Sequence, residues 1–269
     1  MRLAQREWGE PDSPVVVFLH GLGLLGPRLT DEPAEAWAAR GFRVIAPDLP
    51  GFGGSSAVAP DAYLPSRLAG LLLGELPERF ALVGFSWGGT IGCHIVAQAP
   101  ERVTALVLVD VGYQTPPPQP ASYEELLEQE RTESEEMRFP DSDAFIAAVR
   151  PHFSTRITDA QLLASMRDDD GALVPELAPE VYAAAMHGVQ AEPPQPLLGA
   201  VEEAELPVLL LVAGRPPGDE RVNEVEAFRR AIPRAEVLHF AEASHSVLVD
   251  AADEAIPAVG EWLVVALVA

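Results

Sequence analysis

Short apolar runs alternate along this chain with segments that have the spacing of amphipathic helices. The runs are bounded by glycine or proline and have the length of buried strands. They cover residues 15–20, 42–46, 80–85, 103–109, 208–213 and 236–240. The helical segments between and after them cover residues 33–40, 63–76, 87–99, 220–231 and 253–268. This order predicts an α/β fold: a mostly parallel central sheet with helices on both faces.

The alternation stops in the middle of the chain. Residues 114–204 contain prolines, acidic clusters and helical segments, but no convincing apolar strand. We therefore predict a core domain made of residues 1–113 and 205–269, and an inserted helical cap made of residues 114–204. Ligands bind at the carboxyl edge of a parallel sheet, where such an insertion lies, so we expect the cap to shape a substrate pocket.

Composition excludes several classes of function. The 269 residues include 18 basic and 41 acidic side chains, which gives a net charge of −23. Phosphate groups repel such a surface, so we expect neither nucleic-acid binding nor electrostatic attachment to an anionic membrane. The single cysteine, Cys93, excludes an internal disulfide and Cys-based zinc sites. The chain has no signal-like start and no apolar run that could span a bilayer, so we expect a cytoplasmic protein without metal or cofactor.

Ser86 is the candidate nucleophile. It stands in the sequence Gly84-Phe85-Ser86-Trp87-Gly88, directly after a predicted strand and directly before a predicted helix. A sharp strand–turn–helix of this kind exposes the serine hydroxyl. The helix N-terminus also places unpaired N–H groups and a positive dipole end beside a developing oxyanion. The alternative interpretation is a glycine-rich turn with a capping serine.

A serine hydroxyl needs a general base, and His245 has the most suitable position among the six histidines. It lies in a loop between the last predicted strand and the last predicted helix. From there it can reach the sheet edge that carries Ser86. The alternative is a solvated loop histidine.

Four motifs in this order resemble the α/β-hydrolase-fold superfamily, in its branch with a helical cap. They are His20-Gly21-Leu22-Gly23, the stretch at residues 47–55, the turn at Ser86, and Ser244-His245-Ser246. The resemblance covers residues 1–113 and 205–269. It implies that His245 is the general base, and that the backbone N–H groups of Leu22 and Trp87 form the oxyanion hole. It also implies a structural role for His20.

The resemblance leaves the acid of the triad open. In the family the acid usually follows the strand predicted at 208–213, commonly three residues after its terminal glycine. In this chain that position is Pro217, and the nearest carboxylate is Asp219, displaced by two residues. We expect Asp219 to orient the base. The first alternative is Asp110, at the end of strand 103–109, and the second is Glu220.

Together these features predict a cofactor-independent serine hydrolase acting on a small ester, thioester or lactone through an acyl-enzyme. A serine nucleophile argues against the dehalogenase and epoxide hydrolase branches, which use a carboxylate there. Carbon–carbon bond hydrolases and proline-type aminopeptidases are alternatives on the same fold. An aminopeptidase would need cap carboxylates for the substrate amine, and Glu124, Glu125 and Glu128 are candidates. The alternative of another class is a non-catalytic, ligand-binding member of the fold.

One predicted cap helix carries three side chains that could either pack within the cap or touch substrate. Tyr182, Met186 and His187 share a possible face of the helix that begins near Pro179. We expect this face to pack within the cap rather than to touch substrate.

Overall fold

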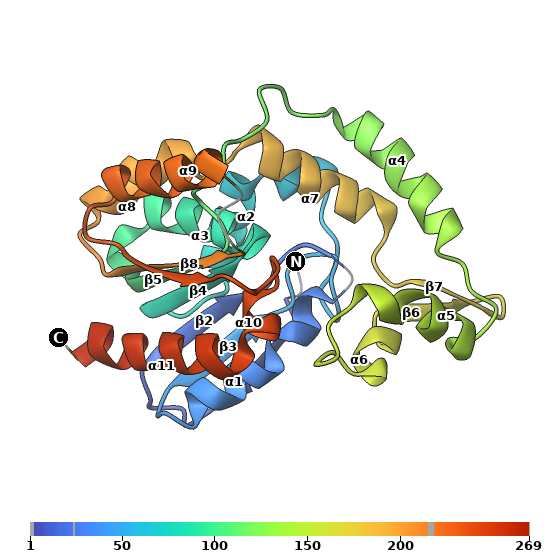
Figure 1. Cartoon of the computed structure of the whole chain (residues 1–269), viewed down its shortest axis with the longest axis horizontal. Coiled ribbons are helices and arrows are strands. Elements are labelled where there is room, and N and C mark those ends of the chain that lie inside the picture. The colour runs from blue at the N-terminus through green and yellow to red at the C-terminus, as the bar shows by residue number, and fades with distance from the viewer. Residues whose placement is uncertain (1–2, 24, 215–217, 269) are drawn as a thin grey trace.

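The central sheet has seven strands, in the order β1-β3-β2-β4-β5-β8-β9 (Figure 1). The computed structural model describes residues 3–23, 25–214 and 218–268. The strands are β1 (Gln5–Trp8), β2 (Val15–Leu19), β3 (Arg43–Pro47), β4 (Phe80–Phe85), β5 (Val103–Val109), β8 (Val208–Ala213) and β9 (Glu236–Phe240). All neighbouring pairs are parallel except β1 and β3. The predicted mostly parallel sheet is therefore confirmed, with one antiparallel edge strand, β1, that the sequence analysis missed.

Helices cover both faces of the sheet. On one face lie α1 (Asp31–Ala38), α10 (Val247–Asp250) and α11 (Ala252–Val268). On the other lie α2 (Pro65–Leu73), α3 (Trp87–Gln98) and α9 (Gly218–Ala231) (Figure 1). None of the described helices is long and apolar enough to cross a membrane.

The central strands are apolar throughout because both of their faces are covered. Side chains of a strand alternate between the two faces. In β8, Leu210 and Val212 join the core cluster on one side of the sheet, and Leu209 and Leu211 join the cluster on the other. Each such fully buried side chain contributes about 1.5–3 kcal/mol relative to an exposed one.

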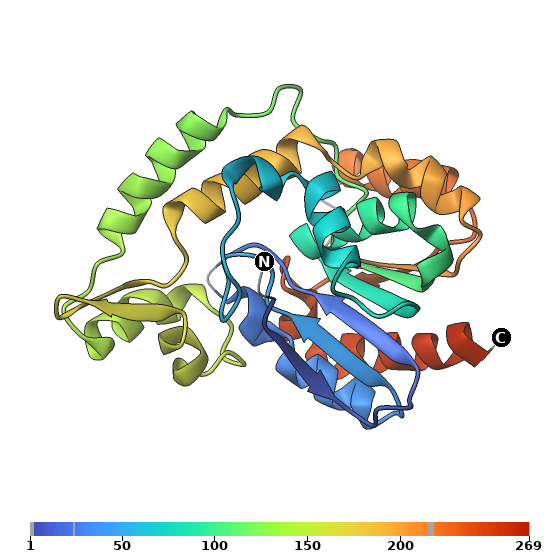
Figure 2. The same cartoon turned by 180° about the vertical axis from the view of Figure 1, so that it is seen from behind.

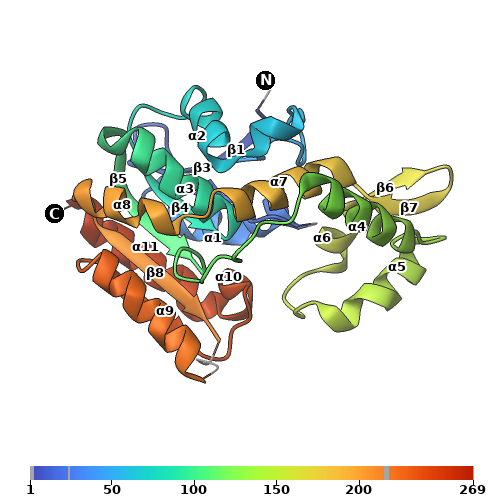
Figure 3. The same cartoon turned by 90° about the horizontal axis from the view of Figure 1, so that it is seen from above.

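The residues between β5 and β8, called the insertion below, form a mainly helical arm. Its larger elements are α4 (Tyr123–Glu136), α5 (Ser142–Val149), α6 (Asp159–Leu163), β6 (Met166–Asp169), β7 (Ala172–Pro175), α7 (Pro179–Ala191) and α8 (Leu198–Glu203). Figure 2 shows α4 and α7 side by side, leading to the small β6–β7 sheet with α5 and α6. Viewed from above, α4, α5, α6 and the β6–β7 hairpin extend to one side of the central sheet, whereas α8 lies beside α3 (Figure 3).

The β6–β7 hairpin corrects the expectation that the insertion lacks strands. Its strands have four residues each, and the first is Met-Arg-Asp-Asp, which carries no apolar run. The turn between them contains Asp170 at φ 51° and Gly171 at φ 81°. Strands this short, one of them polar, give too little sequence signal of their own.

Candidate active site

Ser86 sits at a strained turn between β4 and α3. Its backbone has φ 51° and ψ −116°, a conformation that L residues rarely adopt. The glycines around it permit the close approach of helix and strand: a Cβ at Gly84 would overlap the Cα of Gly89, and one at Gly88 would overlap the carbonyl oxygen of Leu19. The local sequence thus fixes the backbone that presents the hydroxyl.

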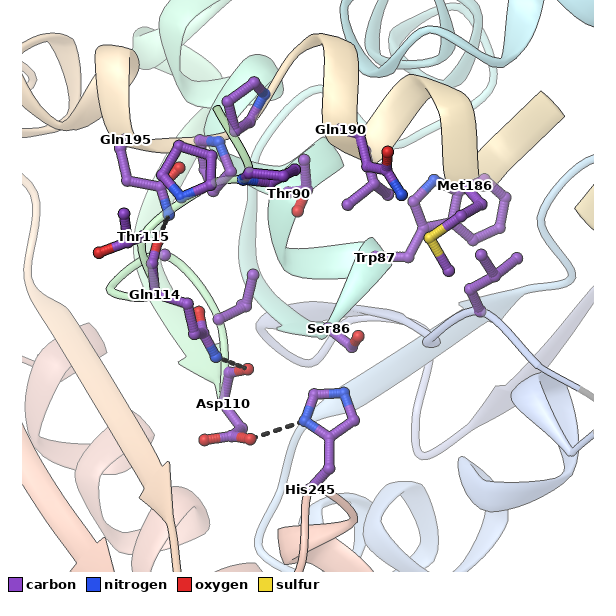
Figure 4. Close-up of a pocket in the computed structure, with 18 residues that line it drawn as sticks. Ser86, Trp87, Thr90, Asp110, Gln114, Thr115, Met186, Gln190, Gln195 and His245 are labelled. Carbon is purple, nitrogen blue, oxygen red and sulfur yellow. Dashed lines mark hydrogen bonds and ion pairs between the residues drawn. The ribbon is translucent and has the colours of Figure 1, made fainter. Parts of the chain in front are cut away.

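The imidazole of His245 is bound by the carboxylate of Asp110. His245 lies in the loop between β9 and α10, and its Nδ1 is 2.6 Å from Oδ2 of Asp110 (Figure 4). Phe85 packs beside the imidazole, with ring centroids 5.0 Å apart. The His245 side chain is 54% exposed, so a substrate and water can reach it.

Burial and several hydrogen bonds together hold the Asp110 side chain in place. It follows β5 directly, again at φ 51°, and its side chain is 5% exposed. Oδ1 accepts hydrogen bonds from the Tyr113 hydroxyl at 2.6 Å and from the Ala213 N–H at 2.9 Å. Burial by itself raises the pKa of this carboxyl, but the hydrogen bonds from His245, Tyr113 and Ala213, with the charge of His245, outweigh burial and lower the pKa. Asp110 is therefore an ionised, fixed partner for the imidazole.

The carboxylate that contacts His245 is that of Asp110, which the sequence offered as the alternative to Asp219. The ionised carboxylate of Asp110 can only accept a hydrogen bond, so the Nδ1 of His245 carries a proton and donates this hydrogen bond. The physical reason is the strand order, because β5 lies between β4 and β8 and its end therefore adjoins both Ser86 and the loop after β8. The side chains of Asp219 and Glu220 lie outside the described residues.

Ser86 and His245 face one cavity of about 250 Å³. In Figure 4 the imidazole lies next to the Ser86 side chain, and the two come from different elements. Among the described residues, no hydrogen bond joins these two side chains. A rotation of the short serine side chain about its Cα–Cβ bond changes the Oγ position, and such contacts often tighten only when substrate binds.

The loop after β2 passes directly beside the nucleophile. A Cβ at Gly21 would lie 3.4 Å from the Cβ of Ser86. Leu22 from this loop and Trp87 from α3 both line the cavity. The two residues predicted to supply oxyanion N–H groups are thus on the same side of the site as Ser86.

His20 holds that loop in place. Its Nδ1 is 2.8 Å from the Gly21 carbonyl oxygen, and its Nε2 accepts a hydrogen bond from the Leu49 N–H at 2.9 Å. An Nε2 that accepts a hydrogen bond carries no proton, so the proton is on Nδ1. Burial lowers the pKa of His20 to about 4, and the charges of Arg6 and Arg28 act in the same direction. The structure therefore gives His20 the structural position that was expected.

Most of the remaining cavity wall was not foreseen. Met186 lines the cavity, although we expected it to pack within the cap. The other unforeseen residues are proline, glutamine, threonine, valine and glycine. They are Thr90, Val111, Gly112, Gln114, Thr115, Pro116, Pro117, Val189, Gln190, Pro193, Pro194 and Gln195. They come mainly from the loops at the two ends of the insertion, where no periodic pattern marks them.

Other singled-out residues lie away from the cavity. Glu124, Glu125 and Glu128 are exposed on α4, and none of them lines it. Cys93 is buried, and burial raises the pKa of its thiol to about 12, so it is not a reactive thiolate. Within the described part of the chain, no three His, Cys, Asp or Glu side chains are grouped so that they could hold a metal ion.

Comparison with known proteins agrees with this architecture. A model of the alpha/beta hydrolase fold family matches residues 14–252. The thioesterase domain from the curacin biosynthetic pathway superposes with a TM-score of 0.73 at 21% identity, covering 95% of this chain and 94% of that one. At this identity the superposition shows the fold alone.

Curated relatives match over a shorter stretch. The pimeloyl-acyl-carrier-protein methyl ester esterase of Vibrio campbellii is 36% identical over 98 residues, which is 36% of this chain and 36% of the relative. Epoxide hydrolase A of Mycobacterium tuberculosis is 36% identical over 116 residues, 41% of this chain and 36% of the relative. The alignments therefore span about a third of the length of these relatives.

Proposed function

Because the chain belongs to the alpha/beta hydrolase fold family, we propose that it is a serine hydrolase with Ser86, His245 and Asp110 as its catalytic triad. Its substrates are small esters, thioesters or lactones. The observation that carries the proposal is the 2.6 Å contact between His245 Nδ1 and Asp110 Oδ2 at the cavity that Ser86 lines. An imidazole oriented in this way turns its Nε2 into an acceptor for the serine proton.

The proposed reaction has two halves. Ser86 Oγ attacks the acyl carbon while His245 Nε2 takes the hydroxyl proton, and the backbone N–H groups of Leu22 and Trp87 stabilise the oxyanion. His245 then gives the proton to the departing alcohol or thiol, which leaves an ester of Ser86. In the second half, water attacks the same carbon while His245 takes one of its protons. The C–Oγ bond then breaks, His245 returns that proton to Ser86 Oγ, and the acid and free Ser86 are released. Asp110 stabilises the imidazolium in both halves.

Among the relatives, the esterase supports this chemistry better than the epoxide hydrolase does. The residue at the turn is Ser86, and by resemblance the epoxide hydrolase branch uses a carboxylate there. The exposed positions of Glu124, Glu125 and Glu128 on α4 count against an aminopeptidase, because among the described residues after Asp110 no carboxylate of the insertion lines the cavity. A non-catalytic role was favoured only by the displaced Asp219, and Asp110 removes that argument. In this proposal the insertion acts as a cap that shapes the acyl pocket.

A fluorophosphonate probe and a short ester test the function together. We expect the wild-type protein to be labelled and to hydrolyse p-nitrophenyl butyrate. Ser86→Ala should lose the label and lower kcat at least about 10⁴-fold while its circular dichroism spectrum stays unchanged. A wild-type protein that is folded but neither labels nor cleaves any short ester or thioester contradicts the proposal and favours a ligand-binding role.

A further inference from the structure

We propose that the acyl group bound in this cavity is short and uncharged; the inference rests on the proposed function and names its substrate class. The cavity is lined by 18 residues. Only two of them, Asp110 and His245, have ionisable side chains, and both are already engaged with each other. The described cavity wall therefore offers no separate charge for a substrate.

An anionic acyl group has no arginine or lysine partner among the described residues of this wall. A carboxylate that leaves water without a cation or several hydrogen-bond donors loses several kcal/mol of hydration free energy. Two arginines of the insertion are paired elsewhere: Arg131 pairs with Glu180 at 2.9 Å, and Arg138 pairs with Asp169 at 2.7 Å. The net charge of −23 also lowers the local concentration of anions around the molecule.

A cationic acyl group is equally unsupported. Among the described residues, the only carboxylate at the cavity is that of Asp110, whose two oxygens accept hydrogen bonds from His245, Tyr113 and Ala213. Competition for this carboxylate would disturb the base that the reaction needs. The same cavity wall therefore disfavours both anionic and cationic acyl groups.

The walls are apolar and rigid. Two pairs of consecutive prolines, Pro116–Pro117 and Pro193–Pro194, face the cavity from the loops at the two ends of the insertion. Proline has a fixed φ, so these walls give way less readily than ordinary loops. Met186 and Val189 of α7 add apolar surface.

The glutamine side chains of the wall tie its loops together. Gln195 Nε2 donates a hydrogen bond to the Gln114 carbonyl oxygen, and Gln114 Nε2 donates to the Asp110 carbonyl oxygen at 2.9 Å. Gln190 Oε1 accepts a hydrogen bond from the Ala121 N–H at 2.8 Å. These contacts join the start of the insertion to its end, so the volume is set by a cross-linked wall.

The volume limits the acyl length. A cavity of about 250 Å³ corresponds to about eight water molecules at about 30 Å³ each. An acyl group of up to about eight non-hydrogen atoms therefore fits, and longer chains must protrude into solvent. A butyryl group and a methyl-capped succinyl group are both within this limit.

Three matched methyl esters test the charge preference. We measure kcat/KM for methyl butyrate, dimethyl succinate and monomethyl succinate by titration at constant pH 8 in about 0.5 M NaCl, which screens the long-range charge of the protein. Dimethyl succinate should be cleaved within about tenfold of methyl butyrate, and monomethyl succinate at least about 100-fold more slowly, because the free carboxylate finds no partner.

The outcomes separate this inference from the function itself. Cleavage of monomethyl succinate within threefold of dimethyl succinate overturns the inference and leaves the serine hydrolase standing. Failure to cleave any of the three esters, together with failure of Ser86 to react with the fluorophosphonate probe, overturns both.

A designed gain of activity sharpens the test. Met186→Arg introduces a cation from α7 at the cavity, and Met186→Gln is its uncharged control. We expect Met186→Arg to raise the ratio of kcat/KM for monomethyl succinate over methyl butyrate at least about tenfold relative to Met186→Gln. An equal ratio in the two variants contradicts the inference that the missing charge limits the reaction.

Discussion

The sheet edge and the insertion contribute different properties to the same cavity. At the sheet edge, Ser86 and Asp110 each follow a parallel strand at φ 51°, and their positions are set by backbone that neighbouring strands hold. The insertion contributes prolines, glutamines and Met186, which are neutral and act through shape. The difference supports the proposal that the sheet fixes the chemistry while the insertion selects the substrate.

The insertion itself is divided between two cores. Leu198 and Val201 of α8, with Val181 and Ala184 of α7, belong to the main cluster beside the sheet. The outer elements form a separate small cluster that touches the core domain only through Leu25 and Val249 among its buried members; its other buried residues are Phe145, Ile157, Leu162 and Met166. The half that walls the cavity is thus part of the main core, and the outer half is attached to it.

The largest expected effect tests the sheet edge. Asp110→Asn keeps the shape but removes the negative charge that stabilises the imidazolium, and it favours the wrong imidazole tautomer. We expect kcat to fall roughly 10³- to 10⁴-fold for methyl butyrate and dimethyl succinate alike. Steady-state kinetics with both esters measures this.

The control is Asp219→Asn, the residue that the family pattern favours. We expect it to remain within about threefold of wild type, since one carboxylate already occupies Nδ1 of His245. A loss that appears in Asp219→Asn and is absent from Asp110→Asn would return the acid to Asp219.

The next prediction compares the stability of the two halves of the insertion. The same change, leucine to alanine, is made separately at one buried leucine in each half. Leu198→Ala in the main cluster should lower the free energy of unfolding by about 3–5 kcal/mol and the Tm by at least about 6 °C. Leu162→Ala in the outer cluster should open only the outer elements. Its Tm should change by less than about 2 °C, while amide hydrogen exchange in α5 and α6 speeds up.

Calorimetry and hydrogen exchange on both variants decide the comparison. Equal losses of Tm would mean that the insertion unfolds as one unit with the sheet, and the division into two cores would be wrong.

How much the sequence predicts depends on how local each feature is. The turn at Ser86 was predictable because the strand, the glycines and the helix that create it are consecutive in the chain. The acid was harder to choose, because Asp110 is identified by contacts with Ala213 and with His245, which lie 103 and 135 residues further along. A spacing rule taken from a family cannot report such contacts.

The insertion shows the same limit. Its helices α4 and α7 were predicted from long segments with helical character, but the four-residue strands β6 and β7 were not. The cavity wall comes largely from proline loops whose positions depend on the hydrogen bonds of Gln114 and Gln195. Such cross-links between distant loops carry no periodic signal.

The smallest of the expected effects concerns the acid sensitivity of the sheet edge. His20 is buried, and its folded-state pKa of about 4 lies below the value of 6.5 that it has in the unfolded chain. A depressed pKa stabilises the fold while the imidazole is neutral, so the contribution is complete above about pH 6.5 and is lost as the pH falls to about 4. The difference corresponds to about 3 kcal/mol, at about 1.4 kcal/mol per pH unit.

His20→Gln isolates this contribution. Glutamine does not titrate, and both proteins contain the same carboxylates, so the titration of the carboxylates cancels in the comparison. Urea unfolding at pH 7 and pH 4 should show that the wild type loses about 3 kcal/mol more than the variant over this interval. Protonation of Nε2 sets an N–H against the Leu49 N–H, so the loop that carries Leu22 should loosen first, and ester hydrolysis should decline before the insertion unfolds. Identical pH dependence in the two proteins would mean that the imidazole is not held neutral, and that the sheet edge owes its geometry to the backbone alone.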